Sequence, residues 1–311
     1  MDRSVRLNKL FSFFKKDTDN QIITAILDKS KPLFSEHIVS LVDVYCPDIK
    51  TTKFYTKLRL GTMELYSLGA YIMLLISGKK YNKYRVLSKI LGLNKNYFLF
   101  LLKFINFPKD LNKQIIYASA FNVLIDHVFD SYLKQFDPNK RAKIIKLAIN
   151  SKSVDKDKNM VSLLSYLAQN LNSKNIKYFE KWCDAEVKSI NKQMSIRDFG
   201  VKATMDLLYG TISKQVSKKN IKLMYEVGYF VQMLDDYIDL EEDIKNKHMT
   251  PVIQNIWNYD TIIEQYYKCE KLTCDIAIEN DISKKLLPLI KGSVMYLSYN
   301  LVKKMGNRSG N

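Results

Sequence analysis

Residues 228–251 have the sequence GYFVQMLDDYIDLEEDIKNKHMTP, and this stretch decides how the chain is interpreted. Asp235, Asp239 and Asp243 follow one another at four-residue intervals, so on a helix they form one acidic stripe together with Asp236. Like charges at this spacing repel each other, and near the C-terminal end of a helix the macrodipole disfavours them further. The stripe is framed by large apolar side chains, which are typical of an interior helix. Carboxylates in such a setting require a cation.

A second acidic pair lies in residues 121–133, which have the sequence FNVLIDHVFDSYL. Asp126 and Asp130 stand one helical turn apart, and their neighbours are again apolar. Each pair taken alone is also compatible with acids that are simply solvated. Two such pairs on separate apolar helices favour a joint metal site.

The ligand types indicate which cation such a site would bind. Carboxylates without His or Cys select Mg²⁺ or Mn²⁺ rather than zinc. The chain has only three His, and its four Cys form no CxxC pair, so the sequence indicates neither a zinc site nor a disulfide framework. Because Mg²⁺ usually completes its coordination with water and substrate phosphate oxygens, open carboxylate pairs suit a metal that is bridged to a diphosphate.

The hydrophobic pattern predicts an all-α fold. Apolar residues recur at three- and four-residue steps, and almost no stretch alternates as a strand does. We expect helices throughout, including one over 110–134 and one over 219–244. The polar stretch 151–159 is short and lies between segments of similar pattern, so we interpret it as a surface loop. The sequence therefore predicts a single antiparallel helical bundle over 31–311, preceded by a basic amphipathic segment at 1–30.

The formal net charge of +17 raises nucleic acid or an anionic membrane as partners. Only seven of the 49 basic residues are Arg, however, and Lys is spread along the chain, which favours a solvated lysine surface and no nucleic-acid partner. The longest apolar stretches fall short of the roughly 18 residues that a spanning helix needs, so we expect a cytoplasmic protein. Residues 1–20 could contact a membrane peripherally, but we favour an N-terminal helix that docks on the body.

The stretch quoted first resembles the second aspartate-rich motif of the class I isoprenoid diphosphate enzymes, which include the trans-prenyl diphosphate synthases and the terpene synthases. The positions that match are Gly228, Phe230, Gln232, Asp235, Asp236 and Asp239. DDYIDLEED is also similar to the acidic segment of the tetraprenyl-β-curcumene synthase family of bacterial terpene cyclases. DHVFD at 126–130 resembles the DxxxD motif of those cyclases and of squalene and phytoene synthases. Beyond the motifs, the resemblance extends over roughly residues 55–300 as architecture only.

The resemblance implies a fold of the class I terpenoid synthase type and a site in which Mg²⁺, replaceable by Mn²⁺ and numbering three ions, holds a prenyl diphosphate. The implied metal ligands are Asp126, Asp130, Asp235, Asp236, Asp239 and Asp243, with Asp126, Asp130, Asp235 and Asp239 as the catalytic set. The implied diphosphate-binding residues are Lys202, Gln232, Lys245 and Lys247. The pocket-lining candidates are Phe121, Phe129, Tyr209, Tyr229 and Phe230, each of which is individually more typical of core.

Departures from the motifs of chain-elongating enzymes favour one subclass. Asp126 is followed by His127 rather than by a second Asp and an Arg pair, and Gly78, Lys79 and Arg85 only loosely resemble the upstream motif for a second diphosphate substrate. We therefore expect a Mg²⁺-dependent class I terpene synthase that ionises a linear prenyl diphosphate of about C15 to C25 or longer and releases diphosphate. A chain-elongating or head-to-head trans-prenyltransferase is the first alternative, and a basic helical RNA- or membrane-binding protein is the second. The sequence leaves a homodimer open.

Overall fold

The computed structural model of the chain describes residues 2–14, 23–24, 26, 28, 35–47, 60–90, 106–150, 159–172, 174–190, 197–245 and 249–306. All regular structure in these ranges is helical, which confirms the predicted all-α class. The backbone contacts group the chain into two compact units, each of which is described by itself. The first unit comprises residues 1–29, 68–106 and 213–311, and the second comprises 30–67 and 107–212. The predicted division at residue 30 stays a prediction.

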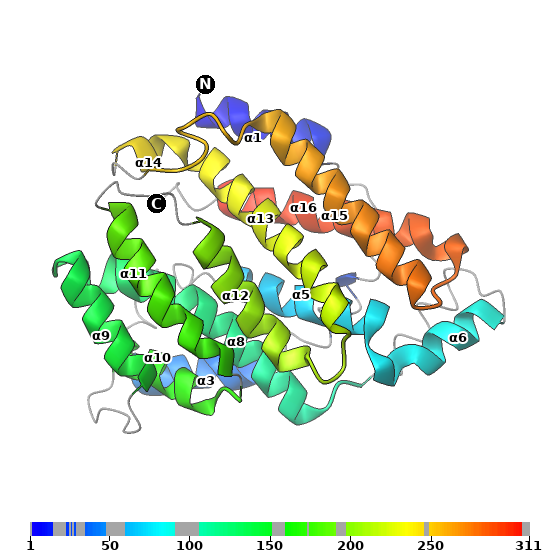
Figure 1. Cartoon of the computed structure of the whole chain (residues 1–311), viewed down its shortest axis with the longest axis horizontal. Helices are drawn as coiled ribbons and strands as arrows, with labels where there is room; N and C mark the ends of the chain where they lie inside the picture. The colour runs from blue at the N-terminus through cyan, green and yellow to red at the C-terminus, as the bar shows by residue number, and fades with distance from the viewer. Residues whose placement is uncertain are drawn as a thin grey trace. The chain divides into compact units, whose positions relative to one another are not determined.

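The first unit is built on α13, α15 and α16. Its helices are α1 (Arg3–Phe13), the greater part of α5 (Leu60–Ser77), α6 (Asn82–Ile90), α13 (Ile221–Ile238), α14 (Leu240–Lys245), α15 (Tyr259–Glu279) and α16 (Leu287–Gly306). α13 and α15 run side by side, and α16 packs against both (Figure 1). Leu234, Tyr266 and Val302, one from each of these helices, are fully buried in one core. Burial of each such side chain stabilises the fold by about 1.5–3 kcal/mol.

The second unit surrounds α8, a helix that is buried on almost every side. Its elements are η1 (Ser35–Val39), α3 (Ser40–Tyr45), α8 (Lys109–His127), η4 (Val128–Tyr132), α9 (Pro138–Asn150), α10 (Met160–Asn170), η5 (Lys174–Lys177), α11 (Tyr178–Ile190) and α12 (Arg197–Ile212). α8 packs against α10 and α12, while α9 packs against α10 and α11. Phe121 of α8 meets Phe179 of α11 edge to face, with ring centroids 5.0 Å apart. Every residue of α8 from Ile115 to Ile125 is buried, as expected for a helix in the interior of a domain.

The N-terminal helix α1 docks on the first unit, as we favoured. Leu10 and Phe14 are fully buried in the same core as α13 and α15, and the Phe14 ring lies 5.3 Å from that of Tyr266. Phe11 and Phe13 pack against this core as well. The apolar face of α1 is therefore occupied within the protein. Membrane contact through residues 1–20 stays a prediction, and residues 15–20 lie outside the described ranges.

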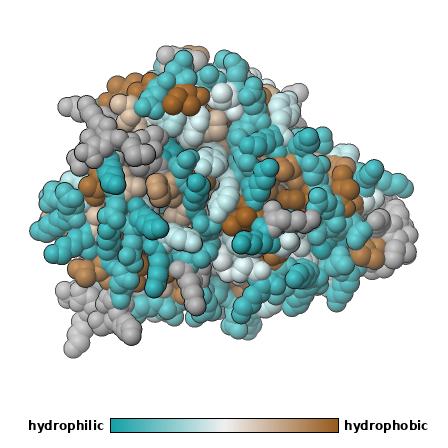
Figure 2. Space-filling model, viewed as in Figure 1, coloured by the Kyte–Doolittle hydropathy of each residue, from teal (hydrophilic) through white to brown (hydrophobic). Residues whose placement is uncertain are grey.

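The described surface is largely polar on the face drawn in Figure 2, where hydrophobic side chains form small, separate patches. Such scattered apolar residues are usual for a folded domain. Among the described residues, no helix has both the length and the apolar character that crossing a bilayer demands.

Candidate functional site

The acidic stripe of the first unit does not lie on one continuous helix, so the prediction of a helix over 219–244 is wrong at one point. α13 ends at Ile238, Asp239 follows with φ −95° and ψ 16°, and α14 begins at Leu240. The sequence alone placed these acids near the C-terminal end of a helix, where the macrodipole disfavours them. The interruption removes this unfavourable interaction for the later acids, because they stand in the first turn of a new helix. The positive end of the helix dipole favours carboxylates at that position.

The carboxylates of α13 differ in their surroundings. Asp236 is only 2% exposed, and Gln232 Nε2 donates a 2.8 Å hydrogen bond to Asp236 Oδ1. Asp235 is half-buried, as is Asp239 one turn on. Asp243, in α14, is buried. This environment gives Gln232 a direct role as a partner of the acidic motif, so Asp236 is held from within its own helix while Asp235 and Asp239 face a less enclosed region.

Two arginines of α1 contact this acidic segment, and sequence reasoning did not connect them with it. Arg3 Nη2 lies 3.1 Å from Asp239 Oδ1, and the Arg3 backbone N–H donates to Glu241 Oε1 at 3.0 Å. Arg6 Nη1 lies 3.4 Å from the same Glu241 oxygen. The signal in the sequence is the spacing of Arg3 and Arg6, which places both cations on one face of a short helix. Cations on one amphipathic helix thus meet the acids of another.

Arg6 is the more deeply placed of the two arginines. Its residue is 1% exposed, Nη2 donates to the Ile238 carbonyl oxygen at 3.2 Å, and its guanidinium carbon lies 5.9 Å from the centroid of the Tyr237 ring. The bond to Ile238 satisfies a carbonyl at the C-terminal end of α13, where intrahelical donors run out. Arg6 therefore fixes the helix end from which the acidic segment departs.

In the second unit, the predicted helix over 110–134 changes its form between the two acids. Asp126 lies in the last turn of α8, whereas Asp130 lies in the π-helix η4. The wider turn is visible in the bond from the Leu133 N–H to the Val128 carbonyl oxygen, five residues back, at 3.0 Å. Asp126 is half-buried and Asp130 is exposed. Short π-helical turns recur at functional sites, because they change the direction in which side chains point within a helix.

The end of η4 is also closed by an arginine. Arg141 of α9 donates to the carbonyl oxygens of Phe136 at 2.7 Å, Lys134 at 2.8 Å and Phe129 at 3.4 Å. Its guanidinium carbon lies 5.8 Å from the centroid of the Phe129 ring. The turn that follows Asp130 is thereby tied to α9.

The predicted diphosphate-binding lysines are less informative. Lys202 is exposed on α12 of the second unit, and Lys245 is exposed at the end of α14 in the first. Lys247 lies outside the described residues. Their predicted roles therefore stay predictions.

Three of the aromatic candidates have well-defined packing roles. Phe121, Phe129 and Phe230 are 0–4% exposed and meet other aromatic rings, which are Phe179, Trp182 and the pair Phe14 and Tyr266, respectively. Tyr209 and Tyr229 are half-buried. The three phenylalanines thus contribute to the cores of their units, and pocket lining stays a prediction for all five.

Arg85 is the last residue of the motif at 78–85 that loosely resembles the binding motif for a second diphosphate substrate. Its side chain donates hydrogen bonds to backbone carbonyl oxygens. Its Nη1 donates to the oxygens of Leu75 at 2.9 Å and Gly78 at 3.0 Å, and its Nε donates to that of Asn280 at 2.8 Å. The side chain is 3% exposed. These bonds join the end of α5 to the loop after α15 and leave the guanidinium turned inward.

The carboxylates of the acidic segments are oxygen donors, the type that Mg²⁺ prefers. Among the described residues, no group of three or more His, Cys, Asp or Glu side chains converges on one point. Mg²⁺ commonly takes one or two protein carboxylates and completes an octahedron with water and phosphate oxygens. Asp235 and Asp239, one turn apart and half-buried, fit this smaller requirement. The two acidic pairs belong to different units.

The four cysteines do not suit metal binding or nucleophilic chemistry. All are buried, and burial raises the pKa of the Cys183 and Cys269 thiols to about 12. Because the thiolate is the reactive form, these residues remain protonated and inert near neutral pH.

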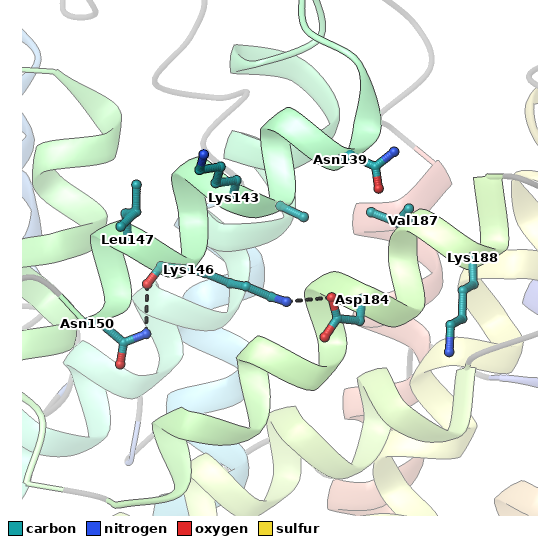
Figure 3. A pocket seen from close by; sticks show the side chains of 9 residues that line it. Asn139, Lys143, Lys146, Leu147, Asn150, Asp184, Val187 and Lys188 are labelled. Carbon is teal, nitrogen blue, oxygen red and sulfur yellow. Dashed lines mark hydrogen bonds and ion pairs between the residues drawn. The ribbon is translucent and has the colours of Figure 1, made fainter.

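A surface groove of about 600 Å³ lies between α9 and α11 in the second unit (Figure 3). Its lining residues are Asn139, Ala142, Lys143, Lys146, Leu147, Asn150, Asp184, Val187 and Lys188. Lys146 reaches across it to pair with Asp184, as Figure 3 shows. Both lysine and apolar side chains line the groove, and neither acidic pair does.

The comparisons with known proteins add no relative. No family model matches the chain, and neither a curated protein nor a solved structure matches it. The acidic segments and their surroundings are therefore the basis on which a function is proposed.

Proposed function

We propose that the protein is a Mg²⁺-dependent class I terpene synthase that ionises a linear prenyl diphosphate, forms a terpene from the resulting carbocation and releases diphosphate. The observation that carries the proposal is the placement of Asp235 and Asp239. They stand one turn apart where an interior helix is interrupted, with buried Asp236 held by Gln232 beside them. A solvated acidic surface would not require this arrangement inside an apolar helix. The all-helical fold is consistent with the terpenoid synthase type.

In this mechanism Asp235 and Asp239 of the first unit would hold Mg²⁺ through their carboxylates. Within the second unit, Asp126 and Asp130 are proposed as Mg²⁺ ligands in the same way. Mg²⁺ held by these residues would supply positive charge that offsets the charge developing on the leaving diphosphate. Gln232 keeps Asp236 in place, so the acidic motif is preorganised before the substrate arrives. The buried apolar side chains of α13 would help to keep water away from the acidic motif, and exclusion of water protects a carbocation. Lys245 and Lys247, which follow the acidic motif of the first unit in the sequence, are proposed to offset the remaining negative charge there. The same role is proposed for Lys202 at the acidic pair of the second unit.

A single diphosphate substrate fits the structure better than two. Arg85, which a chain-elongating enzyme would need for its second substrate, is committed to three backbone carbonyls. A prenyltransferase and a basic binding protein are therefore treated as outcomes of the test.

The test is diphosphate release from farnesyl, geranylgeranyl and geranylfarnesyl diphosphates with Mg²⁺, each with and without isopentenyl diphosphate. We expect release without the second substrate, and a loss of at least about 100-fold in rate for Asp235→Asn because a charge-stabilising contact is removed. Asp275→Asn is the matched control, since Asp275 is an exposed acid on α15 of the same unit. Its rate should equal that of the wild type.

Each other result points to a different conclusion. Release only with isopentenyl diphosphate would identify a chain-elongating enzyme and overturn the cyclase. Absence of release from every substrate would favour the binding protein. Full activity in Asp235→Asn, with an unchanged helical circular dichroism spectrum, would remove the metal assignment.

A further inference from the structure

The groove between α9 and α11 is lined by residues that the proposed function does not use (Figure 3). Along α9 it extends from Asn139 to Asn150, a length of about 17 Å at the rise of an α-helix. Two polar contacts join the helices beside it: Asn150 Nδ2 donates to Glu180 Oε1 at 3.1 Å, and Lys146 pairs with Asp184. The groove is therefore a depression between two helices of one unit that are held to each other.

The charges around this groove are mainly positive. α9 carries four basic residues and no acid. Lys143 of α9 and Lys188 of α11 both line the groove, and in the view of Figure 3 they lie to either side of the pair that Lys146 makes with Asp184. Within the part of the chain that the structure describes, neither Lys143 nor Lys188 forms an ion pair. These two cations can therefore bind an anionic partner.

Apolar side chains lie in the same depression as the lysines. Leu147 of α9 lines the groove and is 62% exposed, and Val187 of α11 and Ala142 of α9 line it as well. An amphipathic helix recognises a groove of this composition, because its apolar face enters the depression while its charged flanks contact side chains of opposite charge. The groove between α9 and α11 thus favours a helix with acidic flanks.

We propose that the groove between α9 and α11 binds an acidic amphipathic helix of a partner protein. The aliphatic face of that helix covers Leu147 and Val187, and its carboxylates pair with Lys143 and Lys188. Charge complementarity selects this occupant, because a second copy of the same face would place lysine against lysine. A nucleic acid would bring phosphates next to Asp184 and would leave the exposed leucine without an apolar partner. The inference is independent of the proposed terpene synthase activity, since neither acidic pair lines the groove.

The experiment measures binding of a fluorescein-labelled peptide to the full chain by fluorescence anisotropy. The peptide is about 18 residues long, so that it can form a helix by itself, and its leucine stripe is flanked by glutamates on both sides. We expect a dissociation constant of about 10 µM. Two control peptides, one with Gln at every Glu position and one with Ser at every Leu position, should each bind at least about 10-fold more weakly.

Variants of the chain test the charged and the apolar contact separately. Lys143→Glu combined with Lys188→Glu should weaken binding of the acidic peptide about 10-fold, and should bind a peptide with Lys at every Glu position more tightly than the wild type does. Leu147→Gln should weaken the acidic peptide about 5-fold. The matched controls are Lys109→Gln, at an exposed lysine of α8, and Val44→Gln, at a 50% exposed position of α3. Both lie outside the groove lining, so their affinity should equal that of the wild type.

The outcomes decide whether the groove is a docking site and for which partner. A dissociation constant above about 1 mM for the acidic peptide, or equal losses in the groove variants and the matched controls, would overturn the proposal. Equal affinity of the wild type for the glutamate and lysine peptides would overturn it as well, because the groove would then not select by charge. If a fluorescein-labelled RNA duplex bound more tightly than the acidic peptide and lost its affinity in the double lysine variant, the groove would be a nucleic-acid site and the proposal would be wrong. Loss of the acidic peptide together with gain of the lysine peptide in that variant, at an unchanged helical circular dichroism spectrum, supports the proposal.

Discussion

In both units a helix is interrupted at the acidic segment and an arginine bonds to the backbone there. The units differ in whether arginines also pair with the carboxylates. In the first unit α13 stops at Ile238 immediately before Asp239, and in the second α8 changes to a π-helix between Asp126 and Asp130. Each end is closed by an arginine from another helix of the same unit. The same device thus appears twice.

The partners of the two arginines show the difference. Arg6 is buried, and its hydrogen bonds include one to a carbonyl and one to the carboxylate of Glu241, while Arg3 beside it pairs with Asp239. Arg141 is half-buried, and its three hydrogen bonds go to carbonyl oxygens. The first unit therefore links the stability of a helix end to the charge of its acidic motif. In the second unit, the hydrogen bonds of Arg141 go to backbone carbonyl oxygens, and its guanidinium also lies near the Phe129 ring.

The largest effect is expected for Arg6→Met, which keeps the apolar stem and removes the guanidinium. The guanidinium is buried, and its removal leaves the Ile238 carbonyl oxygen and the Glu241 carboxylate without this donor. The free energy of unfolding should therefore fall by about 3 kcal/mol. Urea unfolding followed by circular dichroism measures this change. Arg6→Lys, which keeps the charge but not the fork, should recover part of the loss. A fall below about 1 kcal/mol would show that Arg6 does not hold the end of α13.

Arg141→Met tests the corresponding position of the second unit. Three carbonyl oxygens lose a charged donor, but the site is half-exposed and water can replace some of the bonds, so we expect a loss of about 2 kcal/mol in the same urea experiment. The comparison predicts a second difference: Mg²⁺ affinity of the first unit's acidic segment, measured by calorimetry, stays unchanged in this variant. A larger loss of stability than in Arg6→Met would break the comparison between the two ends.

Sequence reasoning found both acidic segments and the helices that carry them. Apolar spacing identified α8 and α13 as interior helices, and both are. It missed the interruption at Asp239, because acids repeat every four residues in the sequence whether the helix is continuous or broken. The π-turn was missed for the same reason, since the bond from Leu133 to Val128 leaves no mark in the residue spacing.

The arginine partners could not be predicted because they come from far away in the chain. Arg3 and Asp239 are 236 residues apart, and only the docking of α1 brings them together. The basic face of α1 was recognised, but composition alone fits a membrane, a phosphate or an acidic helix equally well. Charge on a short helix identifies the sign of its partner and not the partner itself.

The smallest effect concerns an ion pair in the N-terminal half of α13, away from the acidic end. Burial alone would raise the pKa of Glu226, but hydrogen bonds from Gln265 and Lys268 outweigh it and hold the pKa below its usual value of 4.5. Lys268 Nζ lies 2.7 Å from Glu226 Oε2, and the Glu226 side chain is 14% exposed. A carboxylate with a lowered folded pKa stabilises the protein above its unfolded pKa, and this contribution disappears as the pH falls through the folded pKa.

Glu226→Gln should therefore cost about 1 kcal/mol at pH 7, reduced by the exposure of its lysine partner, and almost nothing at a pH well below 4.5. Unfolding in urea at a series of pH values measures the difference. Asp184→Asn is the control from the second unit, where the acid is 59% exposed and its pair with Lys146 should contribute less than about 0.5 kcal/mol. A cost for Glu226→Gln that is the same at both pH values would mean that the amide disturbs packing and that the charge of Glu226 contributes nothing. In that case the coupling of charge to stability in the first unit would be confined to the end of α13, where α1 meets the acids.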